Sequence, residues 1–247
     1  MTDTKPEVVN QLGQVAKQHL ERWLLSPALK QHMQAAGDMR KPKKTGPFIA
    51  ISRQSGSDGT QIARLVGEKL GWDVLDKEIL DFMTQRYDTS RSMLEFVDET
   101  NSSWVQDVLS SLADSRLISR DKFVAHLQRI ICLAALHGRV ILVGRGAHAI
   151  LPREHGLAVR IIAPQELRVD HVSARRSLSR QEAAAAINET DKRRKEFCQR
   201  YFHFDNDDPL QYDLTINTAR MAPAEAADVI IEAFRQVVED PHRPAAA

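Results

Sequence analysis

The stretch "FIAISRQSGSDGTQIARLVGEKLGWDVLD", residues 48–76, decides the fold class. It runs from a short apolar strand through a loop of small residues into a helix, and then into a second strand that ends at Asp76. The apolar face of the helix is formed by Ile62, Leu65, Val66 and Leu70, and Gly71 ends the helix. A loop between a strand and a helix N-terminus can bind an anion through backbone N–H groups and the helix dipole.

The loop residues suit phosphate, although the usual lysine is missing. In the general pattern G-x-x-x-x-G-K-[ST], glycines let the backbone approach, lysine reaches the terminal phosphates and Ser/Thr holds magnesium. Here Gly59 falls on the lysine position and Thr60 on the Ser/Thr position. We expect the phosphate-binding residues to be Arg53, Ser55, Gly56, Ser57, Asp58, Gly59 and Thr60. Taken alone, the loop also fits a tight turn that binds no ligand.

Strands and helices alternate along the rest of the chain. Further apolar strands are expected at 139–144, 158–163 and 214–217, and a closing helix at 223–238. Five strands with helical crossovers predict an α/β fold with a parallel sheet, whose ligands bind at the carboxyl ends of the strands. Residues 1–45 form a separate N-terminal helical extension and linker, followed by a domain over 46–247. The apolar stripe of the extension predicts either self-association or packing on its own domain.

Composition excludes several classes of protein. The chain has 247 residues, 43% of them hydrophobic, and a formal net charge of +1. This composition favours a soluble globular protein and argues against non-specific nucleic-acid binding, which needs a strong basic excess. No apolar run approaches the ~18 residues of a membrane span. Two cysteines, interpreted as reduced thiols, favour a cytoplasmic location.

An ordered set of short motifs resembles the cytidylate kinase-like family of P-loop proteins. The family loop reads S-R-Q-x-G-S-G-G-R-E-I-A where this chain has "SRQSGSDGTQIA", so Asp58 replaces a glycine. The later matches are "GWDVLDKEIL", "VILVGRGAHAILP", "RIIAPQELRVDHV", "ETDKRRKEFCQRYF" and "DPLQYDLTINT", which together cover residues 47 to about 235. The resemblance implies a P-loop nucleoside monophosphate kinase fold with a helical acceptor-binding insertion at about 77–120 and a lid at about 186–206.

The resemblance also implies roles for individual residues. Arg145, directly after a predicted strand, corresponds to the arginine that holds the acceptor phosphate, or it is a surface arginine closing a turn. By position rather than by resemblance, Asp76 at the end of a predicted strand could orient the acceptor, hold magnesium through water or cap the next helix, and Arg168 could back the nucleotide base or form a salt bridge. The catalytic candidates are Arg145, Arg53, Lys192 and Arg194, and the substrate-binding candidates are Asp76, Arg145 and Arg193. The basic residues at 192–194 equally fit a solvated helix face.

Two functions of different class follow. The first is ATP-dependent phosphorylation of CMP or dCMP, with ATP and Mg²⁺ as cofactors by resemblance and Arg53 in place of the missing lysine. The second is a non-catalytic nucleotide-binding or regulatory module with a degenerate loop. Nucleotides are the expected partners, with neither nucleic acid nor membrane, and the N-terminal helices could form a homo-oligomer. The motif "HFDNDD", residues 203–208, matches no metal-binding pattern, so no protein metal site is expected.

Overall fold

The computed structural model describes residues 6–24, 27, 45–86 and 120–239, which divide into two compact units. The first unit takes in residues 1–46 and 77–138, and the second takes in residues 47–76 and 139–247. The boundary expected at residues 45/46 and the acceptor-binding role of residues 77–120 stay predictions. Most of that insertion, 87–119, lies outside the described residues.

The first unit is helical. Its helices are α1 (Pro6–Leu24), α4 (Lys77–Arg86) and α7 (Arg120–His137), and α1 contacts both of the others. The apolar stripe of α1 is buried at Ala16, Leu20 and Trp23. These three side chains pack within the chain's own unit, and self-association through α1 stays a prediction.

The second unit is built on a five-stranded, all-parallel sheet, as the sequence predicts. The strand order is β2-β3-β1-β4-β5. The register places Ile51 of β1 between Val143 of β3 and Val159 of β4. The strands are β1 (Phe48–Arg53), β2 (Asp73–Leu75), β3 (Val140–Val143), β4 (Gly156–Ile162) and β5 (Leu214–Asn217). Every residue of β1 and β3 is buried, which fits the apolar sequences at 48–51 and 140–143; the last two residues of β1, Ser52 and Arg53, are polar although they are buried.

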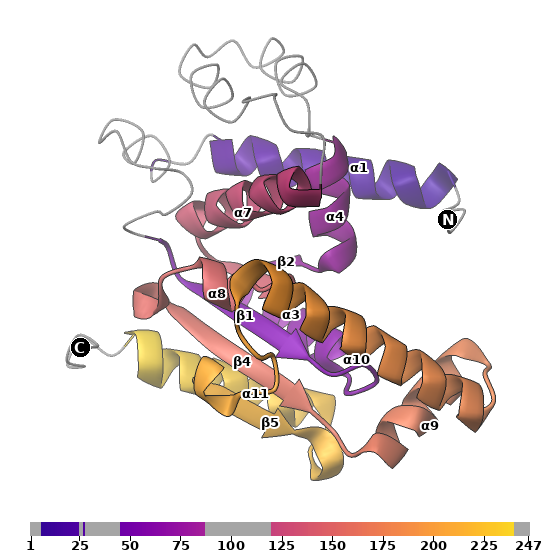
Figure 1. Ribbon diagram of the computed structural model, residues 1–247. Coiled ribbons are helices and arrows are strands. Elements are labelled where there is room, and N and C mark those ends of the chain that lie inside the picture. The colour runs from indigo at the N-terminus through magenta and orange to yellow at the C-terminus, as the bar shows by residue number, and fades with distance from the viewer. Residues whose placement is uncertain (1–5, 25–26, 28–44, 87–119, 240–247) are drawn as a thin grey trace. The chain divides into compact units, whose positions relative to one another are not determined.

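Helices cover both faces of this sheet. Helices α3 (Gly59–Leu70) and α11 (Pro223–Phe234) share one apolar core with the strands, which includes Ile51, Val66 and Phe234. The opposite face carries Ser52 and Arg160, and Figure 1 shows α10 (Arg180–Phe202) crossing in front of the sheet. The remaining helical segments are α8 (Ala147–Ile150), α9 (Gln165–Arg176), three short 3₁₀ turns (Arg153–His155, Pro209–Gln211 and Thr218–Arg220) and a terminal π turn (Arg235–Glu239).

Helix α10 is continuous, so the lid-like segment of the sequence is mostly helical here. Its N-terminus is a capping box, in which the Ser179 side chain accepts from the Glu182 N–H and the Glu182 carboxylate accepts from the Ser179 N–H. Helix α10 packs along α9, and the buried contacts between them include Val172 and Ile187. This packing fixes which face of α10 is turned towards the loop after β1.

Candidate functional site

The loop between β1 and α3 is shaped for an anion. The first hydrogen bond of α3 runs from the Ile62 N–H to the Asp58 carbonyl. The N–H groups of the helical residues before Ile62 are therefore not used by the hydrogen bonds of the helix itself. Gly56 has φ +84°, and a Cβ there would lie 2.7 Å from the Arg168 carbonyl oxygen. Glycine is therefore required at position 56, because both the backbone conformation and the contact exclude a side chain.

A cavity of about 170 Å³ lies against this loop. Its charged lining consists of four arginines and one carboxylate, so its potential is positive. The lining residues are Arg53, Gln54, Ser55, Gly56, Asp58, Gly59, Thr60, Gln61, Val172, Arg175, Arg176 and Arg194. Six of the seven predicted phosphate-binding residues are thus brought together, with three arginines from α9 and α10 around them.

The side chain of Arg53 passes over Gly59, which stands at the lysine position of the general pattern. A Cβ at Gly59, the lysine position of the general pattern, would lie 2.5 Å from the Cβ of Arg53. A Cβ at Gly144 would lie 2.3 Å from Nη1 of Arg53, so the guanidinium reaches the end of β3. The Arg53 stem therefore occupies the space over Gly59 that a larger residue there would fill. That Arg53 replaces the lysine stays a prediction.

Ser57 does not line this cavity. Its side chain is fully buried, and its hydroxyl donates to the Gln54 carbonyl at 2.9 Å. The expectation that this hydroxyl is a phosphate donor is not supported by its position, because the hydroxyl instead stabilises the turn. Ser55 does line the cavity, and its backbone N–H donates to the Asp191 carboxylate at 2.8 Å.

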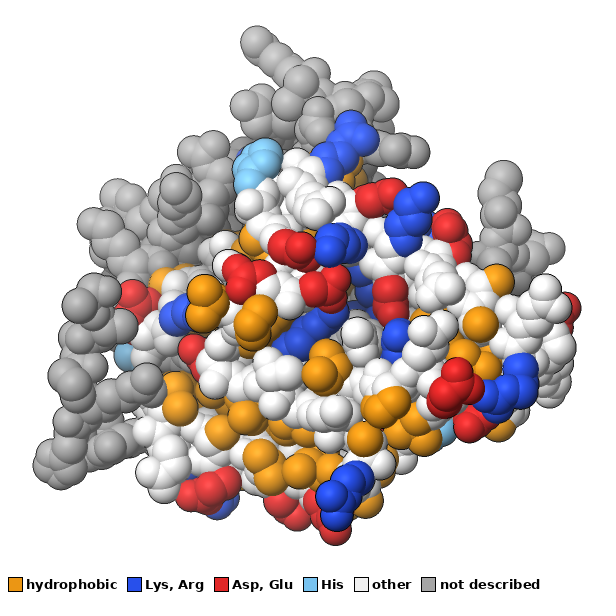
Figure 2. Space-filling view, turned by 60° about the horizontal axis from the view of Figure 1, so that its bottom comes forward, with side chains coloured by type: hydrophobic (Ala, Val, Ile, Leu, Met, Phe, Trp, Pro, Cys, Tyr) orange, Lys and Arg blue, Asp and Glu red, His pale blue; other side chains and the backbone are white. Residues whose placement is uncertain are grey.

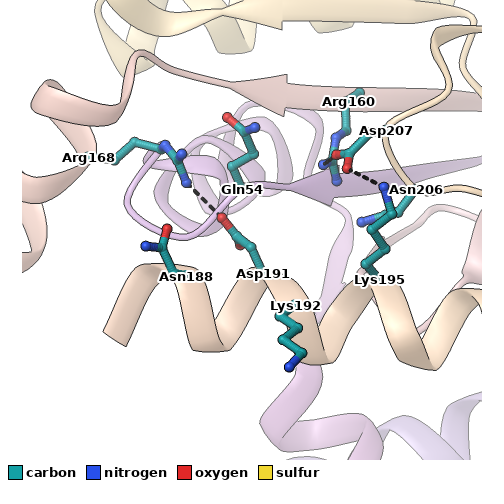
Figure 3. A pocket seen from close by; sticks show the side chains of 9 residues that line it. All are labelled: Gln54, Arg160, Arg168, Asn188, Asp191, Lys192, Lys195, Asn206 and Asp207. Carbon is teal, nitrogen blue, oxygen red and sulfur yellow. Dashed lines mark hydrogen bonds and ion pairs between the residues drawn. The ribbon is translucent and has the colours of Figure 1, made fainter. Parts of the chain in front are cut away.

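A second, larger cavity of about 240 Å³ shares Gln54 with the first. Figure 3 shows its side chains, which come from the loop, β4, α9, α10 and the segment after α10. Every one of them is polar or charged: Gln54, Arg160, Arg168, Asn188, Asp191, Lys192, Lys195, Asn206 and Asp207. A cavity lined in this way suits a small, hydrophilic ligand group better than an apolar ring.

Buried Arg160 organises one end of this larger cavity. Its side chain is 6% exposed and donates to the Ser52 hydroxyl at 2.7 Å and to the Asp207 carboxylate at 2.9 Å. Lys195 lies 3.2 Å from the other oxygen of Asp207 and 2.9 Å from Asp205. The acidic motif at residues 203–208 therefore pairs with basic side chains.

The three consecutive basic residues of α10 have different surroundings. Arg194 faces the loop, where it donates to the Arg53 carbonyl at 2.9 Å and lies 3.3 Å from Asp191. Lys192 borders the larger cavity but is 71% exposed and points away from the other labelled side chains in Figure 3. Arg193 pairs with Glu189 of its own helix at 3.2 Å, as a solvated helix face would.

Arg145 and Asp76 are not among the residues that line these two cavities. Arg145 has φ +55°, and its guanidinium lies 5.2 Å from the centre of the Phe197 ring of α10. Cβ atoms added at the flanking glycines would meet Arg53 at Gly144 and the Phe202 ring, at 2.4 Å, at Gly146. The acceptor-phosphate role of Arg145 stays a prediction. Asp76 is buried after β2, with Arg64 at 3.5 Å.

Sequence reasoning missed several residues of the site. Arg175 and Arg176 close α9, and the double arginine at a helix C-terminus beside the loop is the signal that could have found them. Asp191 lies inside the "TDKRR" motif, whose other charged residues are basic. Of the two roles expected for Arg168, the structure has the salt bridge, a 2.6 Å ion pair with Asp191.

Charges are mixed on the face shown in Figure 2, where Lys and Arg side chains lie beside Asp and Glu side chains. Among the described residues, no group of three His, Cys, Asp or Glu side chains is placed to hold a metal ion. In that same part of the chain, no helix combines the length and the apolar character that a membrane crossing needs.

The parallel sheet, its strand order and the strand–loop–helix unit define the P-loop kinase type of fold. A family model described as the cytidylate kinase-like family matches residues 48–220, and the chain belongs to that family. The resemblance drawn from the motifs is thereby confirmed. A solved structure, an uncharacterized protein from Eubacterium ventriosum, matches with a TM-score of 0.59 and 21% identity over 76% of this chain and 98% of that one. At that identity the likeness concerns the fold.

Two curated relatives match shorter stretches. A cytidylate kinase of Sulfolobus acidocaldarius is 31% identical over 75 residues, which is 30% of this chain and 41% of the relative. A uronate isomerase of Corynebacterium glutamicum is 28% identical over 144 residues, which is 56% of this chain and 28% of the relative. The matched stretches therefore span less than half the length of either relative.

Proposed function

We propose that this protein is an ATP-dependent kinase that transfers a phosphoryl group to a nucleoside monophosphate, with CMP or dCMP as the acceptor. The observation that carries the proposal is the smaller cavity, where Arg53, Arg175, Arg176 and Arg194 surround a loop that leads into a helix N-terminus. Phosphoryl transfer needs positioning and positive charge around the transferred group, with little covalent work by the protein.

The residues present fit the phosphates of a nucleotide. The first N–H groups of α3 and the N–H groups of the loop would bind phosphate oxygens, and the arginines would neutralise charge that develops during transfer. Bound ATP would supply the phosphoryl group, and Mg²⁺ would offset negative charge on the phosphates. Thr60, which lines the cavity, takes the position whose hydroxyl binds magnesium in the general pattern.

The acceptor assignment rests on family membership and on residue positions. Arg145 follows β3 at the carboxyl edge of the sheet, and Asp76 follows β2 at the same edge. We propose that Arg145 holds the acceptor phosphate and that Asp76 orients the acceptor. Lys192, Arg193 and Arg194 would act from α10 as the basic part of the lid, with Arg194 the nearest to the loop. A cytoplasmic location and self-association through the N-terminal helices belong to the same proposal.

The second candidate is a nucleotide-binding module without turnover. Two observations favour it: glycine stands at the lysine position, and the carboxylate of Asp58 pairs with Arg175 inside the cavity lining. The pairing reduces the positive charge available to phosphates. Such a module would bind ATP and leave it intact.

A coupled assay for ADP formation, run with CMP, dCMP and UMP beside a calorimetric titration with ATP, separates the two candidates. Turnover that depends on CMP or dCMP supports the kinase, and Arg53→Ala should then lower kcat more than it lowers ATP affinity. ATP binding with no turnover for any acceptor supports the module. A protein that binds no nucleotide would contradict both.

A further inference from the structure

Three donors converge on one carboxylate at the loop. Asp191 Oδ1 accepts the Ser55 backbone N–H at 2.8 Å and lies 3.3 Å from Nη1 of Arg194. Asp191 Oδ2 accepts from Nη1 of Arg168 at 2.6 Å, as the dashed line in Figure 3 shows. A loop N–H and two guanidinium groups are the donor set that binds a phosphate oxygen in many proteins, and here an internal anion satisfies it.

The arrangement is largely withdrawn from solvent. The Arg168 side chain is 11% exposed and that of Asp191 is 28% exposed. A buried cation without a counter-ion is costly, so the empty protein needs a negative group at this place. Asp191 provides it from α10, 136 residues away in sequence from Ser55.

Asp191 also lies at the boundary of the two cavities. Ser55 and Arg194 line the smaller one, while Arg168 and Asp191 line the larger one, and Gln54 lines both. A phosphate that took the place of the carboxylate would contact the donors of both cavities at once. Asp191 therefore lies between the donors that line the two cavities.

We propose that the Ser55 N–H, Arg168 and Arg194 form an anion site for a phosphate group, and that Asp191 is the internal occupant which an incoming phosphate displaces. The inference rests on the proposed function, because it takes the loop to be a phosphate site. It adds a regulatory element, since every phosphate ligand must compete with a tethered carboxylate. The tether makes this competitor permanently available at high effective concentration.

The test is a calorimetric titration of the full-length protein with inorganic pyrophosphate at fixed ionic strength. Asp191→Asn keeps the size of the side chain and an acceptor for Ser55 but removes the charge. It should bind pyrophosphate about tenfold more tightly than the unaltered protein, equivalent to ~1.4 kcal/mol. The matched control is Glu189→Gln, which removes the same charge from an exposed position on the same helix and should change the affinity less than twofold.

The sign of the change separates competition from a purely structural role. If Asp191 only orients Arg168 and Arg194, Asp191→Asn weakens pyrophosphate binding, and unchanged or weaker binding overturns the inference. The proposed function survives that result as long as the unaltered protein binds ATP. If neither the unaltered protein nor Asp191→Asn binds pyrophosphate or ATP, both proposals fail. The Ser55 N–H, Arg168 and Arg194 would then bind no phosphate even without the charge of Asp191. Asp191→Glu, which keeps the charge, should stay near the unaltered affinity.

Discussion

Asp58 and Arg175 form an ion pair that joins the loop before α3 to the last turn of α9. The second oxygen of Asp58 lies 3.1 Å from Nδ1 of His171, and the Asp58 side chain is only 9% exposed. The sequence comparison marks Asp58 as a departure, because the family loop has glycine there. The structure shows that this carboxylate is directed to α9, where its charge is offset by an arginine of the cavity lining.

Releasing Arg175 should strengthen nucleotide binding. Asp58→Asn removes the charge and still tolerates the left-handed backbone at φ +61°, so we expect ATP affinity to rise by about 1 kcal/mol. Asp58→Gly should give the same direction with a less strained loop. Calorimetric titration with ATP measures both variants. Weaker binding in both would mean that Asp58 supports the bound nucleotide or its magnesium.

The role proposed for Arg145 predicts a loss of catalysis. A guanidinium can hold two phosphate oxygens and align the acceptor, so Arg145→Ala should lower kcat/KM by about a hundredfold, or roughly 3 kcal/mol of transition-state stabilisation. Arg145→Lys should recover only part of the loss. Steady-state kinetics with CMP as the varied substrate makes the comparison.

A control is needed because Arg145 also lies on the Phe197 ring. Thermal denaturation of both Arg145 variants reports any loss of that packing. A stable Arg145→Ala protein with unchanged kinetics would remove Arg145 from the acceptor site, and the acceptor would then have to be held by other groups.

The burial of His148 predicts that the free energy of unfolding falls in acid. Its ring packs against Phe204 and Tyr212, and among the described residues its buried Nε2 has no hydrogen-bond partner. Burial, together with the positive charges of Arg153 and Arg160, lowers its pKa to about 4. The folded protein thus disfavours the imidazolium, whereas the unfolded chain takes up the proton near pH 6.5.

The stability contributed by neutral His148 is therefore complete above pH 6.5 and is lost as the pH falls towards 4. The loss should reach at most ~3 kcal/mol over this window. Urea unfolding across the range should show a shallower pH dependence for His148→Gln than for the unaltered protein. His155→Gln, which changes an exposed histidine, is the control and should keep the original dependence. Equal slopes for the two variants would contradict the assignment.

Substitutions at a buried and an exposed position of helix α1 should change the free energy of unfolding by different amounts. Trp23 is fully buried and stacks on His19, with ring centres 5.6 Å apart, whereas Val15 is 37% exposed. Trp23→Ala should lower the free energy of unfolding by about 3–5 kcal/mol, and Val15→Ala by about 0.5 kcal/mol or less. Chemical denaturation measures both. A small effect at Trp23 would show that α1 adds little to the stability of its unit.

The strands of the sheet could be predicted from the sequence because strand patterns and helix ends are marked by neighbouring residues. The sequence at residues 140–143 is apolar on both faces, which indicates a central strand, and Gly71 marks the end of α3. The position of the loop was also predictable, because a segment of small residues lies between a strand and a helix N-terminus, where anions commonly bind. Which loop side chains face the cavity was only partly predictable. Ser57 resembles Ser55 in sequence, but its hydroxyl donates to the Gln54 carbonyl within the loop.

The remainder of the site depends on long-range contacts. Asp58 and Arg175 are 117 positions apart, and Ser55 and Asp191 are 136 apart, so no local pattern pairs them. The surroundings of Arg145 depend on such contacts too. Arg53 and Phe202, both distant in sequence, fill the space beside its neighbours Gly144 and Gly146.

Helix α10 has 23 residues without a break, which corresponds to a rod of about 35 Å. Asp191 and Arg194 both lie on this rod, so undocking of α10 as a whole would break their contacts with the loop together. Lys195 lies on the same rod and pairs with Asp205 and Asp207. Because the Ser55 amide hydrogen is held by Asp191, its exchange with deuterium in solvent would be slow while α10 is docked. The exchange rate of this one amide would therefore measure how often Asp191 releases Ser55, either because its side chain moves away or because α10 leaves the loop.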